Sequence, residues 1–195
     1  MKFCLNSFNN KSEIVSLIEI ETKKSGFEMS STPETGALLR LLASTKPSGK
    51  FLEIGTGTGL SAAWILDGMD QSSTLISVDN DSKAQNIARN IFLAEKRIEF
   101  VTENGIEYLK RQNAKTFDLI FADAIPGKYE YLAETLELLK DGGIYIVDDM
   151  LPQSDWPDDH YPFAYQALTD LKNLTNVNSV GLHWSTGLII ITKKY

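Results

Sequence analysis

A glycine-rich turn after a short apolar run constrains this chain most. The run 51–54 (FLEI) is followed by Gly55, Gly57 and Gly59. Glycines at the end of a strand let backbone N–H groups approach a ligand that side chains would otherwise keep away. The next apolar run ends in an acidic residue, Asp79. This pattern predicts a site for a nucleoside-containing cofactor.

The rest of the chain alternates apolar runs with amphipathic stretches. We expect strands at 51–54, 75–78, 98–101, 117–121 and 144–147, and helices at 61–66, 82–95, 106–111 and 129–139. Strict alternation predicts a parallel sheet with helices on both faces. The runs 177–183 and 188–192 are separated by a short turn, which predicts an antiparallel hairpin. The expected fold class is α/β: a Rossmann-like, mostly parallel sheet of seven strands that ends in this hairpin.

Two helices are expected before the glycine turn. The first spans 12–25 and stops at Gly26, and the second begins at Thr32 and ends before Pro47. The chain has 195 residues and no linker-like stretch, so we expect a single domain, with helices in 1–46 and a cofactor-binding core in 47–195. The first helix could pack on a second subunit, which makes a homodimer an option.

Charge and composition exclude several classes of partner. A net charge of −7 argues against binding of nucleic acid or of an anionic membrane, so a small molecule is the expected substrate. The segment 1–16 has no apolar signal region, and the cytoplasm is the expected location. Cys4 is the only cysteine, which excludes an intrachain disulfide.

Polar residues follow the expected strands. In an open α/β sheet the ligand lies at the carboxyl ends of the strands. The residues found there are Gly55, Gly57, Gly59, Asp79, Glu103, Asn104, Asp123, Asp148 and Asp149. Asp79 suits a ribose, because a carboxylate offers two acceptor oxygens to two neighbouring hydroxyls. Its alternative role is to cap the next helix.

The glycine spacing separates two cofactor classes. A dinucleotide turn needs GxGxxG, but its third glycine position is occupied by Leu60, and the pattern is GxGxG. Glu53 precedes the turn, and its carboxylate attracts the ammonium and sulfonium cations of S-adenosylmethionine but repels a pyrophosphate. The sequence therefore favours adenosylmethionine over NAD.

The run EIGTGTGLS, from Glu53 to Ser61, resembles motif I of the class I adenosylmethionine-dependent methyltransferases. Within that class the chain is most similar to the small O-methyltransferases of the catechol and caffeoyl-CoA type. The resemblance implies that Ser61 binds the methionine carboxylate, Asp79 the ribose and Asn104 the adenine amino group. The full set expected at the cofactor is Glu53, Gly55, Gly57, Gly59, Ser61, Asp79, Asn104 and Asp123.

Three aspartates resemble the metal site of that family: Asp123, Asp148 and Asp149. Converging carboxylates raise one another's pKa, bind a lysine or arginine, or hold a hard divalent cation such as Mg²⁺. Such a cation could bind the acceptor hydroxyl and lower its pKa. In the alternative without metal, Asp148 caps a loop and Asp149 is solvated.

The chain departs from the family pattern at two positions. Asp149 stands where the metal-dependent relatives have Asn, and Pro126 stands where they have a lysine that serves as general base. The expected catalytic residues are therefore Asp123, with Lys128 or His160 as a replacement for the missing base. The alternative for Lys128 is a solvated lysine at a helix start, and for His160 a polar loop residue.

The stretch 148–162 is the longest without a periodic pattern, and its Trp156 and Tyr161 could form a wall for a flat acceptor or attach the loop to the domain.

The function expected from the whole sequence is methyl transfer from adenosylmethionine to a hydroxyl of a small molecule. Two alternatives are a cofactor-binding module without this chemistry and an NAD-dependent oxidoreductase.

Overall fold

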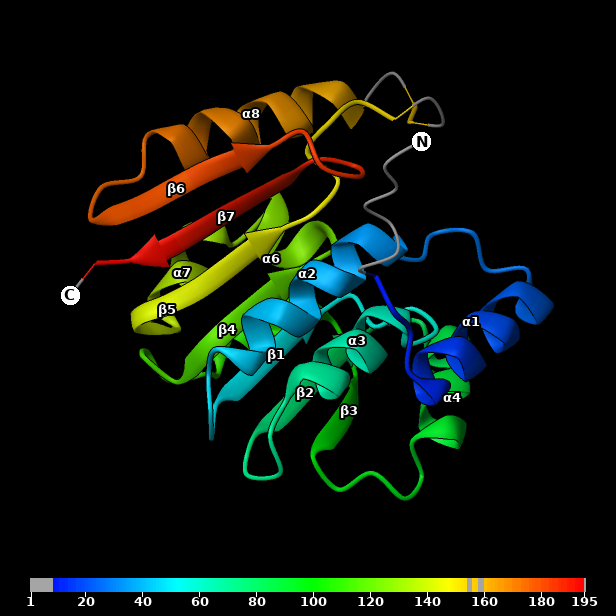
Figure 1. Cartoon of the computed structure of the whole chain (residues 1–195). Helices are drawn as coiled ribbons and strands as arrows, with labels where there is room; N and C mark the ends of the chain where they lie inside the picture. Colours follow the sequence, from blue (N-terminus) through cyan, green and yellow to red (C-terminus); the bar gives the residue numbers. More distant parts are fainter. Residues whose placement is uncertain (1–8, 154–155, 158–159, 195) are drawn as a thin grey trace, which may run out of the picture.

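The computed structural model describes residues 9–153, 156–157 and 160–194. It has one sheet with helices packed on both faces (Figure 1). The strands are β1 (Lys50–Ile54), β2 (Thr74–Asp79), β3 (Ile98–Thr102), β4 (Phe117–Ala122), β5 (Leu139–Val147), β6 (Val177–Leu182) and β7 (Leu188–Lys193). The helices are α1 (Glu13–Ser25), α2 (Pro33–Ser44), α3 (Leu60–Gly68), α4 (Ser82–Ile91), α5 (Gly105–Lys110), α6 (Ile125–Lys128), α7 (Leu132–Glu137) and α8 (His160–Lys172).

The sheet has the order β3-β2-β1-β4-β5-β7-β6. Strands β1 to β5 run parallel, whereas β7 pairs antiparallel with both β5 and β6. The strand order reverses between β1 and β4, which in open α/β sheets opens a crevice at the carboxyl ends of these two strands. The seven-stranded, mostly parallel sheet with a terminal hairpin is confirmed.

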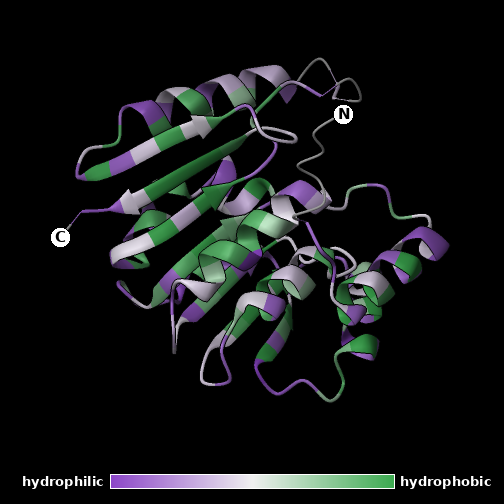
Figure 2. Cartoon of the chain, in the orientation of Figure 1, coloured by the Kyte–Doolittle hydropathy of each residue, from purple (hydrophilic) through white to green (hydrophobic). Residues whose placement is uncertain are grey.

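Successive side chains of the central strands point to opposite faces of the sheet, and each face has its own hydrophobic core. On one face Phe51 and Phe121 pack with Trp64 of α3 and with apolar residues of α1 and α2. On the other face Leu52 and Tyr145 pack with residues of α5, α7 and α8. Figure 2 shows hydrophobic residues along the inner strands, as expected of strands that are covered on both sides. None of the described helices combines the length and apolar character needed to cross a membrane.

The expected helix at 129–139 is wrong. Pro126 and Gly127 have non-helical backbone angles, Tyr131 has a left-handed φ of 63°, and only Leu132–Glu137 is helical. Residue 139, which we had expected to end a helix, begins β5. The leucines of this segment are buried in either arrangement, so apolar spacing alone could not separate a helix end from a strand start. Helix α4 is also shorter than expected, because it ends at Ile91.

The stretch 148–162 is shorter than expected because α8 begins at His160. A proline is tolerated in the first turn of a helix, where its missing N–H group has no partner to lose, so Pro162 does not prevent this start. Residues 154–155 and 158–159 of the stretch lie outside the described residues, as does Cys4. The two N-terminal helices follow the expectation, and Thr32 caps α2 by accepting a hydrogen bond of 3.2 Å from the N–H of Thr35.

Candidate functional site

A cavity of about 630 Å³ opens at the carboxyl ends of β1, β2 and β4. Six of the predicted cofactor residues line it: Gly55, Gly57, Ser61, Asp79, Asn104 and Asp123. The linker between α1 and α2 also contributes Phe27, Met29, Ser30 and Ser31. These four residues were not among the predicted site residues, because nothing in the local pattern of the linker indicates which tertiary surface it crosses.

Two of the positions in the glycine turn require glycine for two reasons: their φ is positive, and neighbouring atoms leave no room for a Cβ. Gly55 has φ +102°, and a Cβ there would lie 2.7 Å from the carbonyl oxygen of Asp123. Gly59 has φ +93°, and a Cβ there would lie 2.6 Å from Cβ of Ala88. Gly59 therefore lets α4 pack against the start of α3 and does not itself line the cavity. Its predicted cofactor contact stays a prediction.

Asp79 is fixed by the backbone around it. Its Oδ2 accepts a hydrogen bond of 2.7 Å from the N–H of Gly57, and its Oδ1 accepts one of 2.8 Å from the N–H of Asp81. Each carboxylate oxygen can accept a second hydrogen bond. The side chain thus ties β2 to the glycine turn and presents acceptor capacity to the cavity.

Asn104 caps α5. Its Oδ1 accepts hydrogen bonds from the N–H groups of Ile106 (2.9 Å) and Glu107 (3.3 Å). Both lone pairs of this oxygen are then engaged, and the amide NH₂ is the group left for a ligand. A contact with an adenine amino group stays a prediction, and the geometry favours donation from Asn104 to a ring nitrogen.

Glu53 lies beneath the glycine turn and does not line the cavity. It is fully buried, its Oε2 accepts a hydrogen bond from the hydroxyl of Ser77, and its Oε1 has no hydrogen-bond partner within the described chain. Burial raises the pKa of Glu53 to about 7, against the opposing effect of the hydrogen bond from Ser77. Strand alternation explains this position, because Glu53 shares a sheet face with Phe51 and that face is covered by helices.

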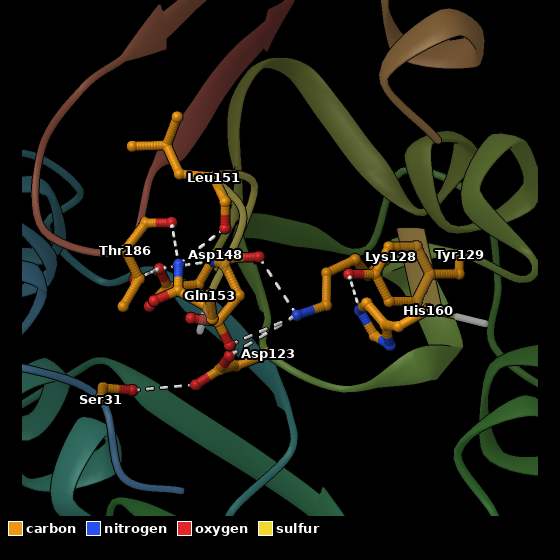
Figure 3. A network of polar contacts seen from close by, with 10 residues as sticks. Ser31, Asp123, Lys128, Tyr129, Asp148, Leu151, Gln153, His160 and Thr186 are labelled. Carbon is orange, nitrogen blue, oxygen red and sulfur yellow. Dashed lines mark hydrogen bonds and ion pairs between the residues drawn. The ribbon is translucent and has the colours of Figure 1, made fainter. Parts of the chain in front are cut away.

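Asp123, Asp148 and Asp149 form an acid cluster at the ends of β4 and β5. Each offers a carboxylate oxygen, and these oxygens lie within 4.8 Å of one another. Asp123 Oδ2 accepts a hydrogen bond of 3.0 Å from Ser31, and Asp148 Oδ1 accepts one of 2.7 Å from Thr186 (Figure 3). Burial, followed by the charge of Asp148, raises the pKa of Asp123 well above its usual value.

Lys128 is buried against this cluster, and the solvated alternative is wrong. Its Nζ donates a hydrogen bond of 3.1 Å to the backbone carbonyl of Asp148, and it lies 3.9 Å from Oδ1 of Asp123 and 3.7 Å from Oδ2 of Asp149 (Figure 3). The non-helical backbone at Pro126 and Gly127 turns the chain inward before Lys128. The structure thus brings this predicted catalytic lysine together with all three aspartates.

His160 reaches the cluster only through an intermediate residue. Its Nε2 lies 2.9 Å from the hydroxyl of Tyr129, and the Tyr129 ring centroid lies 5.3 Å from Lys128 Nζ. The ring of Trp156 lies 4.2 Å from that of His160, between centroids. Burial raises the pKa of Tyr129 to about 12, with the charges of Asp149 and Asp123 acting in the same direction. His160 is therefore placed at helix α8, not on a loop, and beside the site.

The acid cluster fits a hard divalent cation in its chemistry. All three candidate ligands are carboxylate oxygens, the type that Mg²⁺ and Ca²⁺ prefer, and they come from two adjacent strand ends. The metal site, like the individual cofactor contacts, stays a prediction.

Comparisons with known proteins agree with this architecture. A probable O-methyltransferase of Mycobacterium tuberculosis is 35% identical over 121 residues, which are 60% of this chain and 54% of that protein. A putative O-methyltransferase of Mycobacterium ulcerans is 32% identical over 121 residues, with the same coverage. The chain thus spans about half the length of these curated relatives.

Solved structures resemble it over nearly the whole chain. The O-methyltransferase TomG of Streptomyces achromogenes, involved in tomaymycin synthesis and solved with adenosylmethionine, has a TM-score of 0.80 at 19% identity and covers 95% of this chain and 92% of its own. An O-methyltransferase of Bacillus cereus, in complex with adenosylhomocysteine, has a TM-score of 0.82 at 20% identity with the same coverage. A putative caffeoyl-CoA O-methyltransferase of Staphylococcus aureus has a TM-score of 0.80 at 18% identity and covers 97% and 95%.

These structures agree in fold with the present chain, and the family itself is given by the sequence. The family model described as O-methyltransferase matches residues 6–178. That match includes the glycine turn, the acid cluster and Lys128. The chain belongs to the O-methyltransferase family.

Proposed function

We propose that the protein transfers a methyl group from S-adenosylmethionine to a hydroxyl oxygen of a small-molecule acceptor. The observation that carries the proposal is Asp79, whose carboxylate is held at the cavity by the N–H of Gly57. A ribose on Asp79 places the rest of the cofactor along the glycine turn. The complexes of the Streptomyces enzyme with adenosylmethionine and of the Bacillus enzyme with adenosylhomocysteine support this cofactor class.

The methionine end of the cofactor is proposed to lie between Ser61 and Asp123. Ser61 is in the first turn of α3, where backbone N–H groups favour a carboxylate. Asp123 lines the same cavity and also belongs to the acid cluster. The sulfonium methyl would therefore face the acid cluster, where the acceptor must arrive.

The reaction is a direct displacement. The acceptor oxygen attacks the methyl carbon, the carbon–sulfur bond breaks, and the cofactor leaves as the neutral thioether adenosylhomocysteine. We assign to Lys128 the task of stabilising the negative charge that develops on the acceptor oxygen, and to Asp123 that of accepting its proton. We assign to His160 the task of positioning Tyr129 beside Lys128, through the contact of 2.9 Å between its Nε2 and the Tyr129 hydroxyl.

A divalent cation would be held by Asp123, Asp148 and Asp149. When bound there, it would supply Lewis-acid chemistry that lowers the pKa of the acceptor hydroxyl.

Formation of adenosylhomocysteine tests the proposal. The protein is incubated with adenosylmethionine and a panel of catechols, phenols and other hydroxyl compounds, with Mg²⁺ or with a chelator. Asp123→Asn should lower kcat by about 100-fold, in the usual range for loss of an acid–base group. Asp141→Asn is the matched control, because Asp141 is exposed and paired with Lys115 far from the cavity.

Two outcomes would overturn the proposal. Binding of adenosylhomocysteine without turnover of any acceptor would leave a cofactor-binding module. Binding of NAD without adenosylmethionine would indicate an oxidoreductase.

Cytoplasmic location and a homodimer stay predictions. Exposed apolar side chains on α1, Leu17 and Ile20, support a homodimer in which α1 contacts the second copy. Light scattering of the purified protein measures its molar mass in solution, and the mass of a single chain would contradict the homodimer.

A further inference from the structure

Lys128 has the contacts of a bound cation. Its side chain is 6% exposed, and its ammonium lies within 4.0 Å of Asp123 and Asp149 while it donates to the carbonyl of Asp148. On another side it lies 5.3 Å from the ring centroid of Tyr129, which is within the range of a cation–π contact. A buried ammonium is stable only with such partners.

The carboxylate of Asp123 divides its two oxygens between Ser31 and Lys128. Its Oδ2 accepts the hydrogen bond from the hydroxyl of Ser31, and its Oδ1 faces Nζ of Lys128. Asp149 turns Oδ2 toward the same nitrogen. A divalent cation that bound Asp123 through its remaining oxygen would therefore lie on the side that already faces the ammonium.

The ammonium of Lys128 and a divalent cation compete for the acid cluster because both are positively charged. Like charges a few ångströms apart in a buried site repel strongly, and the repulsion from a divalent ion is twice that from a monovalent one. Lys128 cannot leave the cluster without exposing a buried side chain, because it is 5% exposed and follows the inward turn at Pro126 and Gly127.

We propose that Lys128 is the resident cation of the acid cluster, and that it competes with divalent cations for Asp123 and Asp149. The protein then binds Mg²⁺ or Mn²⁺ weakly, and methyl transfer proceeds without them. The second statement rests on the proposed function, whereas the first concerns metal binding alone.

Titration with Mn²⁺, followed by electron paramagnetic resonance, tests the competition without any turnover. Lys128→Met should bind Mn²⁺ at least about tenfold more tightly than the wild type, a difference of about 1.4 kcal/mol. Lys128→Arg keeps the charge and should bind Mn²⁺ as weakly as the wild type. Lys110→Met is the matched control, because Lys110 is an exposed lysine paired with Glu107.

The site of the gain is checked in a double variant. Adding Asp149→Ala to Lys128→Met should abolish the tighter Mn²⁺ binding, because this variant loses the oxygen ligand altogether, whereas Asn would keep one. Tight Mn²⁺ binding by the wild type, unchanged in Lys128→Met, would overturn the proposal.

Lys128→Met leaves three carboxylates without a counter-ion and could fail to fold. In that case the wild type decides: its Tm and its affinity for adenosylhomocysteine should be the same with Mg²⁺ as with a chelator. A Tm that rises by several degrees with Mg²⁺ and loses the rise in Asp149→Ala would contradict the competition. Weak Mn²⁺ binding together with no methyl transfer would contradict the proposed function and leave the competition intact.

Discussion

The hydroxyl of Ser31 donates a hydrogen bond of 3.0 Å to Oδ2 of Asp123, across 92 positions of sequence. Ser31 belongs to the linker that lines the cavity, and Asp123 to the acid cluster. The next residue, Thr32, forms a hydrogen bond of 2.5 Å with Ser185, which precedes Thr186, the residue that donates to Asp148. The linker between α1 and α2 therefore connects the cavity to both strand ends of the acid cluster.

Removal of this hydrogen bond should impair catalysis more than stability. Ser31→Ala frees Oδ2 of Asp123, and hydrogen bonds to charged groups contribute about 1.5–3 kcal/mol. Because the pair is only partly buried, we expect the lower end, a fall in kcat/KM of about tenfold. Steady-state kinetics with Ser31→Thr as the rescue variant and Ser44→Ala as the control check this. Equal losses in Ser31→Ala and Ser31→Thr would mean that the hydroxyl is not the important group.

Glu53 should make stability depend on pH. Burial raises its pKa in the folded state from the usual 4.5 to about 7, so the folded state favours the protonated carboxyl. The stabilisation is complete below about pH 4.5 and is lost as pH rises to about 7. Relative to Glu53→Gln, the wild type should lose up to about 3 kcal/mol in unfolding free energy over this window.

Urea unfolding of both proteins from pH 4.5 to 8 measures this difference. Glu107→Gln is the control, since Glu107 is on the exposed side of α5. If the unfolding free energies of the wild type and Glu53→Gln change with pH in parallel, ionisation of Glu53 does not destabilise the folded protein, and the prediction is wrong.

Alanine substitutions at two glycines should separate the cost of backbone strain from the cost of a steric clash. Gly26 and Gly59 both have left-handed φ, but a Cβ at Gly26 meets nothing within 4 Å, whereas one at Gly59 meets Ala88 at 2.6 Å. Gly26→Ala should cost about 1 kcal/mol, the cost of the left-handed conformation alone. Gly59→Ala should cost about 1–3 kcal/mol more, because α4 must move. Chemical denaturation gives both values, and similar losses would mean that α4 adjusts freely.

Local patterns indicated several of the residues that line the cavity. Gly55, Gly57 and Asp79 are short-range features of a strand–turn–helix unit, and all three line it. Glu53 was expected at the cofactor, yet it faces the helix-covered side of the sheet, which strand alternation with Phe51 would have indicated.

The surroundings of the acid cluster depend on tertiary contacts that sequence periodicity does not report. Apolar spacing predicted a helix at 129–139 with Lys128 just before its start, and it carried no signal for the non-helical backbone at Pro126 and Gly127 that precedes the buried Lys128. The contact between Ser31 and Asp123 joins distant segments and has no local signal. Pro162 likewise obscured the start of α8, although proline is compatible with a first helical turn.

We propose that the cavity beside Asp79 binds adenosylmethionine. Isothermal titration calorimetry with adenosylhomocysteine and with NAD tests this on the wild type, on Asp79→Asn and on the control Asp141→Asn. We predict saturable adenosylhomocysteine binding, no NAD binding, a loss of at least about tenfold in Asp79→Asn, and no change in the control. Binding of NAD alone, or an affinity for adenosylhomocysteine that is the same in Asp79→Asn as in the wild type, would contradict the account.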